Sequence, residues 1–436
     1  MLFKDITIVN ERFEAEEHRN LLVRDGRIAF IGSGLPEKYD RELYEGEIYE
    51  GAGKILMPAF MNAHSHIPMS LLRGYGENMT LHAWLNDRIF PFENHLTGED
   101  VYHGTLLGIA EMLRFGIVST TDMYYHGEDM CRAILESGAM CNLSVGTVCF
   151  DDSAYRELPS FAAAKYLFEN YHGAGNGNLL VDLSIHGEYT STPKVVSQLA
   201  EYGLETGMLV QVHVSETREE HEACKERRGG ATPVQYFRDM KLFDNKTTAA
   251  HCVWIEGDDY DILAEKGVSV ATCPKSNLKL ASGICDAPGL MARGVNVAIG
   301  TDSAASNNNL NMLEEIKFFA LIHKANKMDP TIITPGQALA AATVNGARSQ
   351  GRMDTGLLKE GFRADLIVLK SDEPYLKPCH SVVNNIVYSA VGTDVCLTMA
   401  GGKVLYKDGV YTTIDIEKAM WNAERIRSRI VTALHG

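Results

Sequence analysis

Eight short apolar runs, separated by segments with helical patterns, constrain the fold of this chain more than any other feature. They lie between about residues 54 and 351 of a chain of 436 residues. Five of the runs end at or just before residues that suit metal or proton chemistry, namely the pair His64 and His66, then His186, His213, His251 and Asp302. The other three runs are 116–121, 142–148 and 267–272. Alternating strands and helices predict parallel strands with crossover helices, and eight such units fit a (β/α)₈ barrel of the TIM type.

The two ends of the chain carry a different pattern, in which short strands are joined by tight turns. These strands are 6–9, 20–24 and 27–32 near the start, and 364–369, 397–400 and 404–406 near the end. Neither set is large enough to bury a face by itself, so we expect both ends to share one small β-sandwich module. The prediction is therefore an α/β protein in four segments. They are the first part of the module (1–53), the barrel (54–351), the second part of the module (352–413) and a C-terminal helix (414–436).

Charge and composition argue against nucleic acid and membrane surfaces as partners. The net charge is −16, from 57 acidic and 41 basic residues, and such a surface repels phosphate backbones and anionic lipids. The first residues lack the apolar segment of a signal peptide, and no later run approaches membrane-spanning length. The nine cysteines are scattered and form no C-x-x-C pair, which suits reduced thiols. We expect a cytoplasmic protein that binds a small-molecule substrate, and neither nucleic acid nor membrane.

The triplet His64-Ser65-His66 begins a predicted metal site. Residues two apart on a strand point to the same face, so both imidazoles can reach one ion. In a barrel of this type the reactive groups gather at the carboxyl ends of the strands, which would bring His213 and Asp302 to the same place. Three imidazoles and a carboxylate suit a borderline divalent ion, with zinc favoured over Fe²⁺ or Mn²⁺.

Two further residues are candidates for proton transfer. Glu216 follows His213 by three positions, just beyond a strand end, where it can face the metal and act as a proton shuttle. His251 ends the next strand and can hydrogen-bond the attacking water or the substrate. For any single histidine a structural role is the commoner explanation. The joint placement of these residues at strand ends favours an active site instead.

Several segments resemble the amidohydrolase superfamily, over essentially the whole chain. They are 58–66, 71–74, 249–253, 276–283, 300–308 and, in the small module, 364–368. The chain most resembles the branch that contains methylthioadenosine/S-adenosylhomocysteine deaminases and triazine hydrolases. His186 stands where binuclear members carry a bridging lysine, so the resemblance implies a single metal ion.

The resemblance also implies substrate contacts. Glu93 matches a glutamate that binds ribose hydroxyls, His186 matches a histidine that contacts substrate, and Trp84 is expected to wall the purine pocket. Members that accept S-adenosylhomocysteine hold its carboxylate with arginines between the third and fourth strands, where this chain has only Arg156.

The reaction implied is hydrolytic deamination of an adenosine-like nucleoside, which releases ammonia and an inosine-type product. The implied substrates are adenosine, 5′-deoxyadenosine, 5′-methylthioadenosine and, with less support, S-adenosylhomocysteine. In this scheme Glu216 moves protons to the ring and the departing amine, while Asp302 and His251 orient and deprotonate the water. A homo-oligomer is also plausible from the resemblance.

Two departures from the family pattern keep alternatives open. The sequence after His186 lacks an expected proline, and Ser303 stands where a glycine is usual. The substrate could therefore be another amino- or halo-substituted heterocycle, such as guanine, a pterin or a triazine. A non-catalytic binding or assembly protein on the same scaffold is a third possibility, which the complete ligand set and Glu216 oppose.

Overall fold

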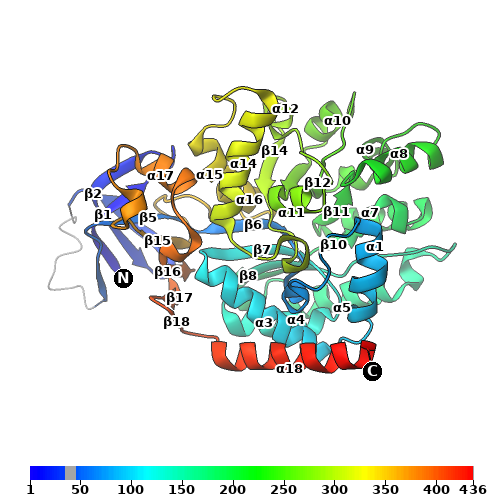
Figure 1. The fold of residues 1–436 in the computed structure, drawn as a ribbon, viewed down its shortest axis with the longest axis horizontal. Helices are drawn as coiled ribbons and strands as arrows, with labels where there is room; N and C mark the ends of the chain where they lie inside the picture. Colours follow the sequence, from blue (N-terminus) through cyan, green and yellow to red (C-terminus); the bar gives the residue numbers. More distant parts are fainter. Residues whose placement is uncertain (35–45, 436) are drawn as a thin grey trace.

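The computed structural model describes residues 1–34 and 46–435 and places a barrel beside a β-rich module (Figure 1). The barrel strands are β6 (Phe60–Ser65), β7 (Ile117–Met123), β8 (Met140–Ser144), β9 (Leu179–Val181), β10 (Leu183–Ile185), β11 (Val210–Val214), β12 (Thr247–His251), β13 (Ser269–Thr272) and β14 (Asn296–Ile299). They pair in parallel in the orders β6-β7-β8-β9 and β10-β11-β12-β13-β14. Only Asp182 separates β9 from β10, so the two make one strand position, and the predicted eight-stranded barrel is confirmed.

The barrel closes where the segment after β14 meets β6. The Asp302 amide donates to the His64 carbonyl at 3.0 Å, and the Thr301 amide donates to Asn62 Oδ1 at 2.9 Å. Gly300 permits this approach, because a Cβ at that position would lie 2.8 Å from the His64 carbonyl oxygen. Closure therefore brings two of the predicted metal ligands, His64 and Asp302, to adjacent strands.

Helices cover the outside of the barrel. The longer ones are α3 (Gly98–Arg114), α4 (Gly127–Ser137), α5 (Pro159–Tyr171), α7 (Pro193–Thr206), α8 (Arg218–Arg227), α9 (Pro233–Asp239), α10 (Asp259–Glu265), α14 (Met312–Lys327) and α15 (Pro335–Ala342). Threonine side chains cap several of these helices, as Thr97 does for α3 in a capping box with Asp100. Such caps satisfy amides that have no partner within the helix. Shorter helices are α1 (Leu81–Trp84), α2 (Phe90–Glu93), α6 (Ala174–Gly177), α11 (Pro274–Lys279), α12 (Ala287–Ala292), α13 (Ala304–Asn307), α16 (Val344–Ser349) and α17 (Val382–Tyr388).

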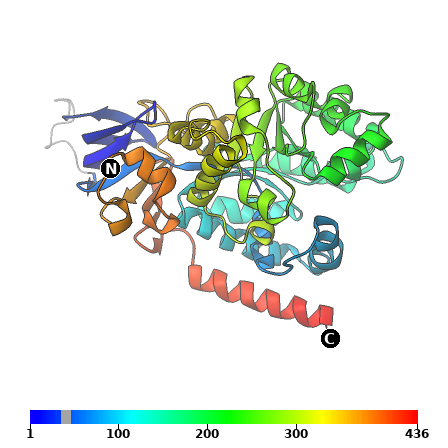
Figure 2. The same ribbon diagram turned by 45° about the horizontal axis from the view of Figure 1, so that its top comes forward.

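Strands from both chain ends form one sheet, as predicted. They are β1 (Leu2–Val9), β2 (Ala15–Arg24), β3 (Arg27–Gly32), β4 (Ile48–Glu50), β5 (Lys54–Pro58), β15 (Leu366–Lys370), β16 (Val395–Ala400), β17 (Lys403–Lys407) and β18 (Val410–Tyr411). The order is β18-β17-β16-β15-β5-β1-β2-β3, with β4 beside β1. Figure 2 shows the N-terminal strands in blue beside the C-terminal segments in orange. The apolar cluster of the module draws on both ends, since it contains Ile8, Leu56, Val368 and Leu397.

The start of the barrel differs from the prediction. Residues 54–58 were assigned to the barrel, but β5 pairs with β15 and β1 of the module. The change of partner occurs within two residues, because the Ala59 amide donates to Asp365 of the module and the Phe60 amide donates to Gly116 of the barrel. Because β5 and β6 are both buried, the sequence shows a single apolar run here. The first strand of the barrel is β6.

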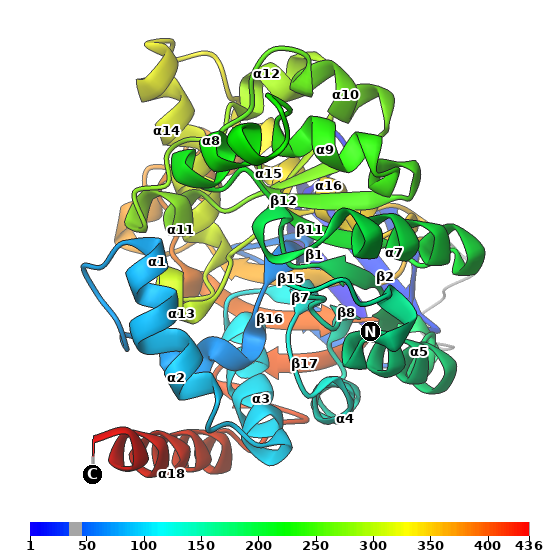
Figure 3. The ribbon, with the colours of Figure 1, turned by 90° about the vertical axis from the view of Figure 1, so that its right-hand side faces the viewer.

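The predicted terminal helix is α18 (Ile416–His435). It lies alongside α3 (Figure 3), with Ala419, Ile426 and Ile430 buried and Arg429 paired with Asp100. Within residues 1–34 and 46–435, no helix combines the length and apolarity needed to cross a membrane.

Candidate active site

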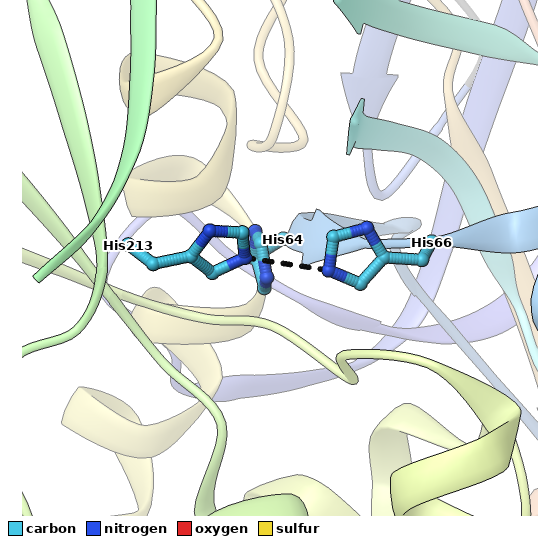
Figure 4. Close-up of side chains that lie close together, drawn as sticks. All are labelled: His64, His66 and His213. Carbon is cyan, nitrogen blue, oxygen red and sulfur yellow. Dashed lines mark hydrogen bonds between the residues drawn. The ribbon is translucent and has the colours of Figure 1, made fainter. Parts of the chain in front are cut away.

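Three histidines converge at the carboxyl ends of the barrel strands. His64 and His66 come from the end of β6 and His213 comes from β11, and a ligand nitrogen of each lies within 4.8 Å of the others (Figure 4). The Nε2 atoms of His66 and His213 are 3.4 Å apart. Asp302 joins them, with Oδ1 lying 3.8 Å from His64 Nε2 and 3.6 Å from His66 Nε2. The four predicted ligands therefore face one small volume.

The hydrogen bonds around these histidines leave their Nε2 atoms free for a metal. His66 Nδ1 donates to the Met123 carbonyl and His213 Nδ1 donates to the His186 carbonyl, both at 2.6 Å. His64 Nε2 is buried and has no hydrogen-bond partner. Burial is the main reason why the pKa values of His64 and His213 lie well below their ordinary value. The buried imidazoles of His64 and His213 are therefore uncharged at neutral pH. With Nδ1 of His66 and His213 donating to carbonyls, the Nε2 lone pairs point into the cluster and fit a divalent ion.

Hydrogen bonds hold both oxygens of the Asp302 side chain. Its Oδ2 accepts hydrogen bonds from Ser276 Oγ at 2.6 Å and Ser306 Oγ at 3.0 Å, and its Oδ1 accepts one from the Ser303 amide at 2.8 Å. Burial alone would raise the pKa of Asp302, but nearby imidazoles and these hydroxyls outweigh burial and hold it below the ordinary value. The side chain is therefore a carboxylate at neutral pH.

Glu216 and His251 face each other beside this cluster. Glu216 Oε2 lies 3.8 Å from His251 Nε2, and both side chains are almost fully buried. Burial raises the pKa of Glu216. Nδ1 of His251 is hydrogen-bonded to Asn277 Oδ1 of α11 at 2.9 Å, which turns Nε2 toward Glu216. A carboxyl group with a raised pKa beside an oriented imidazole is suited to proton transfer.

A cavity of about 790 Å³, including its open mouth, leads from this cluster to the surface. Trp84 of α1 lines it, together with Ile89 of the π-helical turn η4 (Leu85–Ile89) and Phe90 of α2. His186 and Glu93 line it too, and Glu93 Oε1 accepts a hydrogen bond of 2.6 Å from the Tyr124 hydroxyl. The described residues that line the cavity include neither lysine nor arginine.

Arg156 lies elsewhere. It is absent from the cavity lining, is well exposed and pairs with Glu205 at 2.9 Å, while its guanidinium lies over the Tyr202 ring. The expectation that Arg156 binds substrate finds no support in this position.

Sequence reasoning assigned no role to several residues that hold the site together. Ser276 and Asn277 bind Asp302 and His251 from α11, and Tyr124 binds Glu93. Ser276 and Asn277 fall in a segment that resembles the family. The sequence could therefore mark this segment as part of the site, but not that it binds Asp302 and His251. Nothing in the sequence pairs Tyr124 with Glu93, since the contact depends on how the end of α2 lies against the residue that follows β7.

The fold and the site place this chain in the class of (β/α)₈-barrel enzymes, with a histidine cluster at the strand ends that could hold a metal ion. This chain belongs to the Amidohydrolase family, whose model matches residues 55–405. It is 37% identical to the 5-methylthioadenosine/S-adenosylhomocysteine deaminase of Moorella thermoacetica, over 100% of this chain and 99% of that protein. It is 36% identical to the 5′-deoxyadenosine deaminase of Methanothermobacter thermautotrophicus, over 93% of each.

A solved structure agrees closely with this fold. An adenosine deaminase from Xanthomonas campestris with bound zinc superposes with a TM-score of 0.92 at 29% identity, over 99% of this chain and 98% of that one.

Proposed function

We propose that this protein is a metal-dependent hydrolase that deaminates adenosine-type nucleosides to ammonia and an inosine-type product. The observation that carries the proposal is that one cavity joins three chemical parts. These parts are the cluster of histidines with Asp302, the proton-transfer pair of Glu216 and His251, and the carboxylate of Glu93. The deaminase names of the relatives at 36–37% identity support this substrate class over other heterocycles.

His64, His66, His213 and Asp302 would hold one divalent ion. Zinc is the expected metal, because three imidazoles and a carboxylate suit it and the adenosine deaminase neighbour contains it. When bound, the ion supplies Lewis acidity and lowers the pKa of a coordinated water, so that a nucleophile forms at neutral pH.

Glu216 and His251 move and hold protons. The Glu216 carboxylate takes a proton from the attacking water and passes it to the ring nitrogen next to C6. It then takes the second proton of that water, now on the C6 hydroxyl, and gives it to the departing amine, so that ammonia leaves and the C6 carbonyl forms. Burial raises the pKa of Glu216, and a higher pKa makes the protonated form a better proton carrier between the water and the substrate. Asn277 holds Nδ1 of His251, so that Nε2 orients the water for attack at C6.

The far side of the cavity would bind the nucleoside. Tyr124 occupies Oε1 of Glu93, which leaves Oε2 to accept hydrogen bonds from ribose hydroxyls. Burial lowers the pKa of His186 to about 4, so this imidazole is neutral at physiological pH. The Thr190 hydroxyl donates to the Gly187 carbonyl and therefore accepts from His186 Nδ1, which leaves His186 Nε2 as an acceptor for the substrate. Trp84 offers a flat apolar wall to the purine.

The absence of lysine and arginine from the described cavity lining favours compact 5′ groups. A carboxylate such as that of S-adenosylhomocysteine gains most from a paired arginine, and Arg156 is engaged elsewhere. Adenosine, 5′-deoxyadenosine and 5′-methylthioadenosine are therefore the substrates that we favour.

The direct test is ammonia release by the zinc-loaded protein against a panel of adenosines, guanine, pterins and triazines. We expect turnover of the adenosines, with a matching shift of the purine absorbance. Turnover of guanine, pterins or triazines alone would contradict the proposal.

A further inference from the structure

The loop that follows His186 contains a fully buried carboxylate. Glu188 opens the 3₁₀ turn η6 (Glu188–Thr190), and its side chain is 0% exposed. Oε1 accepts a hydrogen bond of 2.7 Å from Arg228 Nε, and Oε2 accepts one from Arg227 Nη2. Arg227 is the last residue of α8, so an ion triad joins this loop to the end of that helix.

The three members of the triad differ in burial. The side chains of Arg227 and Arg228 are 42% and 23% exposed, and Arg228 also lies over the Tyr236 ring of α9. Loss of Glu188 would leave two cations that can still reach water. Loss of Arg228 would leave the buried Glu188 carboxylate with only one cationic partner, so it should lower the stability of the fold more than loss of Glu188 does.

The loop held by Glu188 makes one hydrogen bond to a metal-ligand candidate, and two further contacts within the loop hold the His186 ring. The His186 carbonyl accepts from Nδ1 of the metal-ligand candidate His213 at 2.6 Å. The His186 ring is bonded to Thr190 and packs edge-on against Tyr189, with ring centroids 5.9 Å apart. Both His186 and Tyr189 line the cavity.

The other end of α8 holds Glu216. Glu220, in the first turn of the helix, accepts hydrogen bonds from the amides of Ser215 at 3.0 Å and Glu216 at 2.7 Å. Helix α8 therefore contacts two parts of the site. Glu220 binds the backbone of Glu216, and Arg227 binds Glu188 in the loop that carries His186.

We propose that Glu188, Arg227 and Arg228 are positioning residues. They fix the loop 186–190 on α8, so that His186 and Tyr189 keep a constant position relative to Glu216 and His213. The effect on turnover rests on the proposed function, whereas the effect on the loop itself does not. None of the three residues lines the cavity, so they act through the loop.

The test compares Glu188→Gln with Asp365→Asn. Asp365 is also 0% exposed and pairs with an arginine, Arg363, at 3.1 Å, but it lies in the β module. Backbone hydrogen exchange of the zinc-loaded protein is measured over residues 186–191, where the amides of His186, Thr190 and Ser191 are hydrogen-bonded. We expect faster exchange in Glu188→Gln over this segment and unchanged exchange there in Asp365→Asn.

Kinetics give the second readout. Glu188→Gln should raise KM by up to about tenfold, which corresponds to the loss of one hydrogen bond between His186 and the substrate, with a smaller change in kcat. Arg228→Met should lower the melting temperature more than Glu188→Gln, and Arg228→Lys should recover part of that loss. Exchange and KM of Glu188→Gln that match wild type, or equal changes at residues 186–191 in Asp365→Asn, would overturn the proposal. If wild type deaminates no adenosine, the proposed function fails, and the exchange comparison still decides the positioning role.

Discussion

Nδ1 of His251 lies 2.9 Å from Oδ1 of Asn277, and this contact decides which ring nitrogen of His251 faces Glu216. An amide oxygen can only accept, so Nδ1 carries the hydrogen and Nε2 is available to the site. Asn277→Ala should therefore lower kcat by about tenfold or more while metal content stays unchanged, because orientation of a proton-transfer group is lost. Asn296→Ala is the control, because Asn296 is the first residue of β14 and its side chain binds Ser269 and Asn345 away from the site. Wild-type kcat in Asn277→Ala would remove this contact from the mechanism.

Glu216→Gln should bind metal and substrate but lose turnover. A carboxylate that transfers protons contributes about 10²–10⁴-fold, and an amide of the same shape cannot do so. Glu219→Gln, exposed on the same helix as Glu220, is the matched control and should behave as wild type. Single-turnover kinetics and elemental analysis measure the two effects separately. A loss in Glu216→Gln of less than about tenfold would argue against a proton shuttle at this position.

His66→Ala and Asp302→Ala should lose metal and activity together. Each removes one of the four groups that face the same volume, and the other three cannot close the site. The exposed His95→Ala serves as the control. Elemental analysis should find about one divalent ion per chain in wild type. Two ions per chain, or full activity after exhaustive chelation, would disprove the single-metal arrangement.

The cavity lining predicts a ranking of substrates. Without a lysine or arginine in the described lining to pair with its carboxylate, S-adenosylhomocysteine should lose about 1.5–3 kcal/mol of recognition, or roughly ten- to a hundredfold, relative to an enzyme that has one. Values of kcat/KM for 5′-methylthioadenosine and 5′-deoxyadenosine should therefore match or exceed the value for S-adenosylhomocysteine. Glu93→Gln should raise KM for all of them alike, since each contains ribose. A preference of about tenfold or more for S-adenosylhomocysteine would refute the ranking.

Asp182, between β9 and β10, should make stability depend on pH. Burial raises the pKa of this carboxyl group to about 6. The folded state therefore holds the proton more tightly than the unfolded chain, so stability falls as pH rises from about 4 to about 6. Asp182→Asn removes this unfavourable ionisation. The side-chain nitrogens of Asn142 and Gln211 now face Asp182, so one of these amides must turn over for its unpartnered oxygen to accept from the new amide.

We expect Asp182→Asn to be more stable than wild type at pH 8, by up to about 3 kcal/mol, and to show little advantage at pH 4. Denaturant unfolding at the two pH values provides the measurement, with the exposed Asp372→Asn as control. A less stable Asp182→Asn protein at pH 8 would contradict the sign of this effect.

The parts of the fold that were predictable from the sequence depend on local periodicity. Apolar runs that end in His213 or His251 identify strand ends, and in a barrel all of the strand ends share one face. The division between β5 and β6 could not be predicted, because a run buried in two different sheets reads as one apolar run. Glu188 and Glu220 were missed for another reason. Their partners are set by how helix α8 lies on the barrel, and charged residues near turns are usually solvated.

The direct junction of β5 and β6 at Ala59 has a consequence for the order of folding during synthesis. β5 pairs along its whole length with β15, a strand that the ribosome makes about 300 residues later. The strand that carries His64 and His66 is thus anchored to a module which the nascent chain cannot complete until residues 366–400 have emerged. The strand that carries these two candidate ligands therefore gains its support from the module only late in synthesis, after the residues that form the rest of the histidine cluster have been made.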